Sequence, residues 1–412
     1  MLATSVYQTT PLNTSEISAA RLNIANKTRC NPLSWNGQFS PQLVQVLLQA
    51  YATAGMQVFD PFLGSGTLLL EAGRAKLAAS GTEINPGAIV LAQTYQCINM
   101  APSLRRAHLE QLRALLEQRF PRNLPLFRDN GSPAIEDEAT LKSRLIETLE
   151  SVDTPLERTL LETLVALVDF YKPGLSNDRI LGTFHDLTQH IDALPYSKQP
   201  INIYHADARA TPLAPASVDL VITSPPYINV FNYHQQYRAS MEALRWNLLR
   251  VAKSEIGANR KHRGNRFLTV IQYCLDIAQT LSEMARICKP TARLIFVVGR
   301  ESAVRGTRIF NGEIVAEIAS RAMGFEVLLR QERVFLNRFG QDIFEDLLHF
   351  APSHNPPEDF LPTARDIAAQ VLKTRYDLAS ADARKDIQSA IRNAQIVKPS
   401  PIFEPSQAMA RS

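Results

Sequence analysis

The sequence predicts an α/β protein, a sheet of mainly parallel strands with helices on both faces, extended by a helical insertion and a C-terminal helical tail. Short apolar runs alternate with amphipathic segments over residues 39–100, a pattern typical of strand–helix–strand units. The alternation stops over residues 101–200, where leucines recur at helical spacing, and it resumes from residue 201. Hydrophobic residues make up 45% and charged residues 20% of the 412 residues, so a full-sized core can form.

Each element is placed by its apolar pattern and by the residues that flank it. Amphipathic spacing predicts helices over residues 41–52, 67–78, 87–99, 268–287 and 314–323. Apolar runs predict strands over residues 57–59, 201–204, 218–222 and 294–298, and a further short strand that ends near Glu83. Two late runs, 326–335 and 346–350, predict a final hairpin. The expected organisation is an N-terminal arm (1–27), a main α/β domain (28–100 and 201–352), a helical insertion (101–200) and a C-terminal tail (353–412).

Composition excludes several classes of protein. No apolar run approaches the roughly 20 residues that cross a bilayer, and residues 1–26 lack the basic-then-apolar order of a signal peptide. The four cysteines are scattered, without a CxxC pair or a nearby histidine, which favours neither a disulfide framework nor a metal site. We therefore expect a cytoplasmic protein without a bound metal.

A glycine-rich turn follows the first strand, in the segment Asp60-Pro61-Phe62-Leu63-Gly64-Ser65-Gly66-Thr67. Glycine lets the backbone approach a ligand closely, and the next helix presents unpaired N–H groups. Because a third glycine is missing, the turn predicts a nucleoside cofactor rather than a dinucleotide. Three successive strands end in acids: Glu83 can accept both ribose hydroxyls, Asp207 an adenine amino group, and Asp60 the ammonium of a methionine moiety.

A second motif, Thr223-Ser224-Pro225-Pro226-Tyr227, follows strand 218–222 at the same edge of the sheet. Its two prolines fix φ and remove two N–H donors, which leaves the Ser224 hydroxyl and the Pro225 carbonyl as acceptors. This environment suits an exocyclic base amine, because two acceptors that hold its hydrogens out of the ring plane would localise its lone pair. Tyr227 would stack on a base rotated out of a duplex.

Together, residues 60–67 and 224–227 resemble the S-adenosylmethionine-dependent DNA amino-methyltransferases of the cytosine-N4/adenine-N6 family, TSPPY type. The resemblance covers residues 28–100 and 201–352, which would form a catalytic domain on a Rossmann-like class I methyltransferase sheet. It implies S-adenosylmethionine as the cofactor and a DNA base, flipped in a sequence-specific context, as the substrate; it admits a companion restriction endonuclease as a partner. The cofactor-binding residues expected here are Phe39, Asp60, Phe62, Gly64, Ser65, Gly66, Thr67, Glu83, Ile84, Asp207 and Ala208, and the catalytic residues are Ser224, Pro225, Pro226 and Tyr227.

The resemblance leaves the target base open. Serine at position 224 resembles the cytosine-N4 group, whereas aspartate is usual for adenine-N6, so cytosine N4 is the target expected here. The cofactor turn precedes the amine motif, unlike the order in many cytosine-N4 enzymes, and no separable recognition domain is evident. Cytosine-C5 chemistry is disfavoured, because it needs a cysteine that in that family normally follows proline, and no cysteine here does. Adenine-N6 methylation of DNA, guanine-N2 methylation of RNA and a catalytically silent binding subunit are the alternatives.

Positive charge is concentrated after the amine motif. Residues 228–310 hold 14 Lys and Arg against 5 Asp and Glu, whereas residues 101–200 hold 12 against 15. A concentrated basic loop is typical of phosphate contact. We therefore expect Arg260, Lys261 and Arg263 to contact the nucleic-acid backbone and Tyr233 to reach the base pocket. Phe231, Tyr237 and Trp246 belong to the same aromatic run, either as a stacking wall or as core packing.

Overall fold

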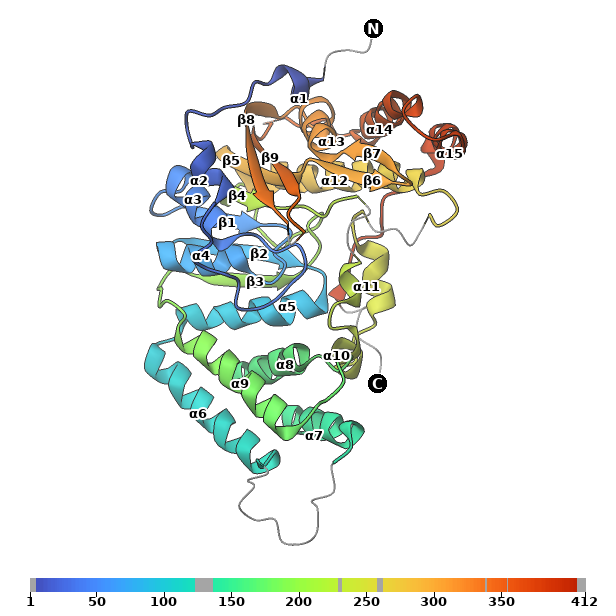
Figure 1. Ribbon diagram of the computed structural model, residues 1–412. Coiled ribbons are helices and arrows are strands. Elements are labelled where there is room, and N and C mark those ends of the chain that lie inside the picture. Colours follow the sequence, from blue (N-terminus) through green and yellow to red (C-terminus); the bar gives the residue numbers. More distant parts are fainter. Residues whose placement is uncertain are drawn as a thin grey trace.

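The computed structural model describes residues 5–122, 136–228, 232–257, 262–337, 339–353 and 355–405, and its centre is a seven-stranded sheet (Figure 1). The strand order is β3-β2-β1-β4-β5-β9-β8. The five neighbouring strands β3, β2, β1, β4 and β5 are parallel, and β9 runs antiparallel to both β5 and β8. The strands are β1 (Gln57–Asp60), β2 (Ala78–Glu83), β3 (Ile201–His205), β4 (Val218–Thr223), β5 (Cys288–Gly299), β8 (Glu326–Leu336) and β9 (Asp342–Ala351). This mainly parallel, Rossmann-like sheet confirms the α/β prediction.

Helices cover both faces of the sheet, because successive strand side chains point to opposite sides. Val58 packs in one buried cluster with α3 (Pro41–Tyr51), α4 (Thr67–Ala75) and α5 (Pro86–Gln93). Phe59, the next residue, packs in the other cluster with α12 (Phe267–Ile287), α13 (Asn311–Glu317) and α14 (Leu361–Tyr376). The chain order reverses between β1 and β4, so the carboxyl ends of these strands flank a crevice in which ligands of such sheets bind.

The segment between α5 and β3 is helical where the structure describes it. It contains α6 (Pro102–Arg119), α7 (Glu138–Glu150), α8 (Pro155–Val168) and α9 (Asn177–Asp192), which lie together below the sheet in Figure 1. The Thr163 hydroxyl on α8 donates to the Val90 carbonyl of α5 at 2.9 Å. Arg105 is fully buried and donates to the Ile191 and Leu194 carbonyls at the end of α9. The Thr163 bond joins these helices to the face of the sheet that carries α5, and the Arg105 bonds join α6 to the end of α9.

Two local details differ from the sequence-based expectations. The helix expected over 67–78 ends at Ala75, because Lys76 adopts a left-handed φ of 56° and β2 begins at Ala78. A short hairpin of β6 (Glu301–Val304) and β7 (Thr307–Phe310) was not expected. Residues 5–27 lie along the body of the protein: Ser5 donates to Glu317, and Leu12 forms a bridge with Arg330 of β8.

No helix in the described ranges is long and apolar enough to cross a membrane. All four cysteines are free thiols. Among the same residues, no three His, Cys, Asp or Glu side chains gather as metal ligands would.

Candidate active site

The glycine-rich turn lies at the carboxyl end of β1, inside the crevice. Gly64 and Gly66 have φ values of 53° and 90°, a left-handed region that favours glycine. A Cβ atom on Gly66 would lie 2.7 Å from the Tyr95 ring, so a side chain is excluded there for steric reasons as well. The turn then passes into α4, whose first N–H groups face the crevice edge.

Glu83 ends the neighbouring strand and is fixed against the turn. Its Oε2 accepts from the Gly64 N–H at 2.9 Å and its Oε1 from the Asn85 N–H at 2.8 Å. Burial raises the pKa of Glu83 to about 7, against these two hydrogen bonds, which lower it. The carboxylate therefore lies beside the turn at the point where a ribose diol is expected.

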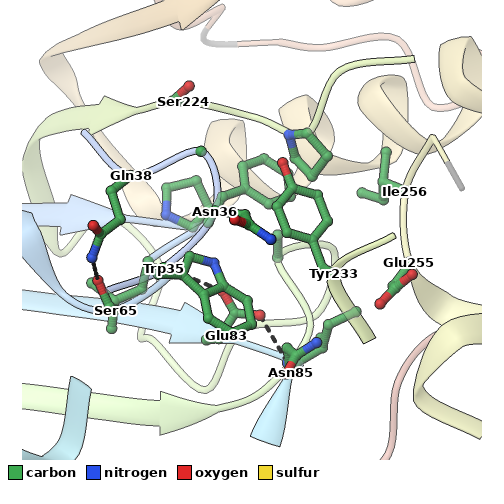
Figure 2. A pocket seen from close by; sticks show the side chains of 18 of the residues that line it. Trp35, Asn36, Gln38, Ser65, Glu83, Asn85, Ser224, Tyr233, Glu255 and Ile256 are labelled. Atoms are coloured by element: carbon green, nitrogen blue, oxygen red, sulfur yellow. Dashed lines mark hydrogen bonds between the residues drawn. The ribbon is translucent and has the colours of Figure 1, made fainter. Parts of the chain in front are cut away.

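A narrow cavity lies above the carboxyl ends of β1, β2, β3 and β4 (Figure 2). The expected cofactor residues that line it are Phe39, Phe62, Gly64, Ser65, Thr67, Glu83, Ile84, Asp207 and Ala208. Gly66 and Asp60 do not line it. Asp60 is buried beneath, where its Oδ1 accepts from the Phe62 N–H and the Thr223 hydroxyl, and burial raises its pKa to about 7.

Residues 31–39 form the cover of this cavity. Gln38 donates to the Ser65 hydroxyl and to the Leu33 carbonyl, which holds the cover on the glycine turn. Trp35 stacks on Tyr233 with ring centroids 6.3 Å apart. Neither Trp35 nor Gln38 was singled out from the sequence, although both belong to a segment that resembles the family. Their contacts join parts of the chain that are far apart, and no local pattern reports such pairs.

The Ser224–Tyr227 motif lies between this cavity and a second, larger groove. Ser224 lines both, Pro226 lines the cavity, and Pro225 and Tyr227 line the groove. The Ser224 and Tyr227 hydroxyls are 3.2 Å apart. The Tyr227 ring packs on Gly299, where an added Cβ would lie 2.7 Å from it. The motif therefore forms a wall with one face toward each space.

The second groove, about 1080 Å³ in volume, combines aromatic and charged side chains that the sequence did not single out. Its basic residues are Lys27, Arg29, Arg300, Arg308 and Arg333, and its acidic residues are Glu301, Asp342 and Glu345. Phe335 and Phe344 add aromatic surface. The basic residues come from the N-terminal segment, β6–β7 and the β8–β9 hairpin, so no charged run in the sequence marks them.

Of the residues expected to contact nucleic acid, only some lie at the cavity or the groove in the described part of the chain. Tyr233 lines both the cavity and the groove. Arg263 is exposed in the turn before α12 and lines neither space, while Arg260 and Lys261 lie outside the described residues, as does Phe231.

Tyr237 and Trp246 pack inside the protein. The Tyr237 hydroxyl donates to the Ser34 carbonyl, and Trp246 makes an edge contact with His205. These two aromatic residues therefore follow the core-packing interpretation.

Asp207 lines the cavity, but other groups of the chain occupy its carboxylate. Oδ1 accepts from the Arg209 N–H and Nε, and Oδ2 accepts from Arg209 Nη2 and from the Phe403 N–H. An adenine amino group would have to displace one of these donors. The contact expected from the sequence therefore has no unoccupied oxygen in this arrangement.

The cavity fits a nucleoside cofactor by its own chemistry. Glu83 offers a carboxylate beside two glycines that allow close approach. The Asn85 amide nitrogen lines the same space, is buried, and has no hydrogen-bond partner in the described part of the chain. Trp35, Phe39 and Ile84 supply apolar walls.

Comparison with known proteins finds a similarity over the N-terminal part of the chain. The family model described as DNA methylase, of N6 and N4 methyltransferases, matches residues 13–94, which include the cover, the glycine turn and Glu83. The type II methyltransferase M.MjaII of Methanocaldococcus jannaschii is 28% identical over 82 residues, which are 20% of this chain and 14% of that protein. The aligned stretch thus spans about one seventh of the relative.

Solved structures give a weaker likeness. An S-adenosylmethionine-dependent methyltransferase from Methanosarcina mazei has a TM-score of 0.34 at 11% identity, covering 75% of this chain and 98% of that one. The PH0226 protein from Pyrococcus horikoshii has a TM-score of 0.34 at 10% identity, covering 80% and 97%. These scores are too low to bear on function. Over residues 13–94 the chain is thus similar to the DNA methylase family of N6 and N4 methyltransferases, and this stretch holds the glycine turn at the switch point of the sheet.

Proposed function

We propose that the protein transfers a methyl group from S-adenosylmethionine to the exocyclic amino nitrogen of a flipped DNA base, with cytosine N4 as the target. The observation that carries this proposal is the position of Ser224, whose side chain lines both the cofactor cavity and the larger groove. A base that enters from the groove would meet the cofactor at this wall. In this proposal, the cofactor in the cavity and the base in the groove therefore meet at Ser224.

Each residue of the site has a physical task. When bound, S-adenosylmethionine supplies an electrophilic methyl group. Glu83 accepts hydrogen bonds from a ribose, and Trp35 and Phe39 exclude water from the cavity. The Ser224 hydroxyl and the Pro225 carbonyl accept hydrogen bonds from the target amine and so orient its lone pair. The amine releases a proton to solvent, so orientation and electrostatics carry the catalysis.

The DNA backbone would follow the larger groove and the basic loop before α12. Arg29 and Arg300 are partly exposed in the groove, where phosphate contact would compete with their carboxylate partners Glu71 and Asp346. Arg260, Lys261 and Arg263 are the further phosphate contacts of this proposal. The relative from M. jannaschii is described as a type II methyltransferase. A sequence-specific context and a companion endonuclease are part of this proposal.

The proposal is tested by identifying the methylated nucleoside. Unmethylated DNA is incubated with the protein and S-adenosylmethionine carrying a deuterated methyl group, then digested to nucleosides for mass spectrometry. Labelled N4-methylcytosine is the expected product. Labelled N6-methyladenine would overturn the choice of base, and methylguanosine formed only in RNA would overturn DNA as substrate. Cofactor binding without any labelled product would indicate a silent subunit.

Cofactor affinity is expected to depend on pH through Glu83. Ribose hydroxyls donate to the ionised carboxylate, whereas burial holds the pKa of the free group at about 7. Binding of S-adenosylhomocysteine should therefore strengthen as the pH rises toward 7 and level off above it, with roughly tenfold weaker affinity at one unit below that pKa. Isothermal titration calorimetry from pH 5.5 to 8.5 measures this profile.

Glu83→Gln is the control for this profile, because glutamine keeps the size of the side chain and does not titrate. The variant should bind more weakly at pH 8 and lose most of the slope below pH 7. Asp60 also has a pKa raised to about 7, so any slope that remains in the variant is assigned to it. An affinity that stays constant with pH in the unchanged protein would contradict the prediction.

A further inference from the structure

The cofactor cavity contains two polar atoms whose hydrogen-bonding capacity the chain leaves unused. Glu255 is 6% exposed and lines the cavity; its Oε2 pairs with His234 Nδ1 at 2.8 Å, while its Oε1 is buried without a partner in the described residues. The second atom is the Asn85 side-chain nitrogen, also buried and without a partner. A buried polar group without a hydrogen-bond partner is unfavourable, so both atoms are available to pair with a ligand in the cavity.

The orientation of both groups is fixed. Asn85 caps α5, and its Oδ1 accepts from the Gly87 N–H at 2.9 Å, which leaves the amide nitrogen as the donor facing the cavity. His234 holds the Glu255 carboxylate through Oε2, which leaves Oε1 as the acceptor. The cavity therefore presents one fixed acceptor and one fixed donor.

Both groups lie on the nucleoside side of the cavity. Asn85 lies next to the carboxylate expected to bind the ribose, because the Asn85 backbone N–H donates to Glu83 Oε1. Glu83 and Glu255 line the same cavity, and the charge on Glu255 adds to burial in raising the pKa of Glu83. In Figure 2, Asn85 and Glu255 lie at one end of the view and Ser224 at the other. Ile84, Ala208 and Ile256 supply apolar surface that suits a planar ring.

We propose that Glu255 and Asn85 recognise the adenine of the cofactor, with Glu255 Oε1 accepting from the 6-amino group and the Asn85 amide donating to a ring nitrogen. Asp207, the residue that the sequence favoured for the amino group, already accepts from Arg209 and the Phe403 N–H. In this proposal, Glu255 accepts the hydrogen bond from the adenine 6-amino group in place of Asp207. This inference rests on S-adenosylmethionine being the cofactor, and it is independent of which base is methylated.

The test compares two ligands that differ at this edge of the base. S-adenosylhomocysteine carries the 6-amino group, whereas S-inosylhomocysteine carries a 6-oxo group and a protonated N1. Calorimetric titration of the full chain without DNA should give an affinity at least tenfold higher for the adenosyl ligand. In Glu255→Gln this ratio should fall to about threefold or less, because the glutamine amide can donate to a 6-oxo group. Asn85→Asp, which keeps the cap acceptor and removes the donor, should also lower the ratio.

Matched variants separate this role from a general effect on the fold. Glu283→Gln changes a carboxylate that is also largely buried but lies outside the cavity, and it should keep the wild-type ratio. A wild-type ratio in Glu255→Gln, or a ratio lost in Asp207→Asn alone, would overturn the inference. The unchanged protein showing no preference would overturn it without any variant. If the unchanged protein binds neither ligand, the cofactor assignment fails together with it.

Discussion

Replacing Ser224 with alanine is expected to lower the rate constant of methyl transfer by about 100- to 1000-fold, the range found when one preorganised polar contact is removed from an active site. The hydroxyl is one of only two acceptors proposed to orient the target amine, and it lies at the wall shared by the cavity and the groove. The affinity for S-adenosylhomocysteine should change by no more than about threefold, because Glu83 and the glycine turn remain. Single-turnover methylation of DNA and calorimetry measure the two quantities.

Ser217→Ala is the matched control for this variant. Ser217 directly precedes β4, at the opposite end of the strand that leads into Ser224, and its hydroxyl donates to the Ala214 carbonyl. Methyl transfer by this control should stay within about twofold of the unchanged protein. If Ser224→Ala transfers methyl groups as fast as the unchanged protein, Ser224 does not orient the amine. If it loses cofactor affinity instead, the serine belongs to the cofactor site alone.

The sequence predicted those parts of the site that each depend on a single short segment of the chain. The glycine turn, Glu83 and Ser224 each follow a strand, and parallel strands bring their carboxyl ends to one edge of the sheet. Local apolar periodicity then places the strands, so the positions of these residues follow without any long-range information. Eight of the eleven expected cofactor residues line one cavity for this reason, and Phe39 lines it from the cover.

The parts that could not be predicted depend on contacts between distant segments. Gln38 meets Ser65, Trp35 meets Tyr233, and Arg333 reaches the groove from an edge hairpin. None of these pairs shares a helical turn or adjacent strand positions, so no periodicity in the sequence reports them. Asp207 illustrates the limit: its position at a strand end was predicted correctly, whereas the donors that occupy it come from Arg209 and from Phe403, 196 residues away.

This last contact shows that the C-terminal segment supports the cofactor cavity. Arg209 has a fully buried side chain and donates to Asp207, Asp276 and the Ser400 carbonyl, while the Ser400 hydroxyl donates to Asp276. Burial raises the pKa of Asp276 to about 6 in spite of the arginine. One cation thus compensates two buried carboxylates and holds the segment before Phe403 against the floor of the cavity.

Arg209→Met is accordingly expected to lower the free energy of unfolding by about 3–5 kcal/mol, because it leaves two buried carboxylates without their cation. Urea denaturation at pH 8, followed by circular dichroism, measures the loss. The loss should shrink as the pH falls toward 5, since protonation of Asp276, whose pKa is already raised, removes the uncompensated charge. Arg106→Met is the matched control: its side chain is 64% exposed and pairs with Asp192, which is 44% exposed, so the loss there should stay below about 1 kcal/mol.

A second variant separates lost charge compensation from lost packing. If the unpaired carboxylate causes the loss, Arg209→Met combined with Asp276→Asn should be more stable at pH 8 than Arg209→Met alone. If packing alone causes it, the added substitution should give no recovery, and the loss in Arg209→Met should be the same at pH 5 and pH 8. Because the Phe403 N–H donates to Asp207 beside the cavity, the single variant should also weaken the binding of S-adenosylhomocysteine, whereas Arg106→Met should not. Unchanged stability in Arg209→Met would contradict the role of this cation in joining the C-terminal segment to the cofactor site.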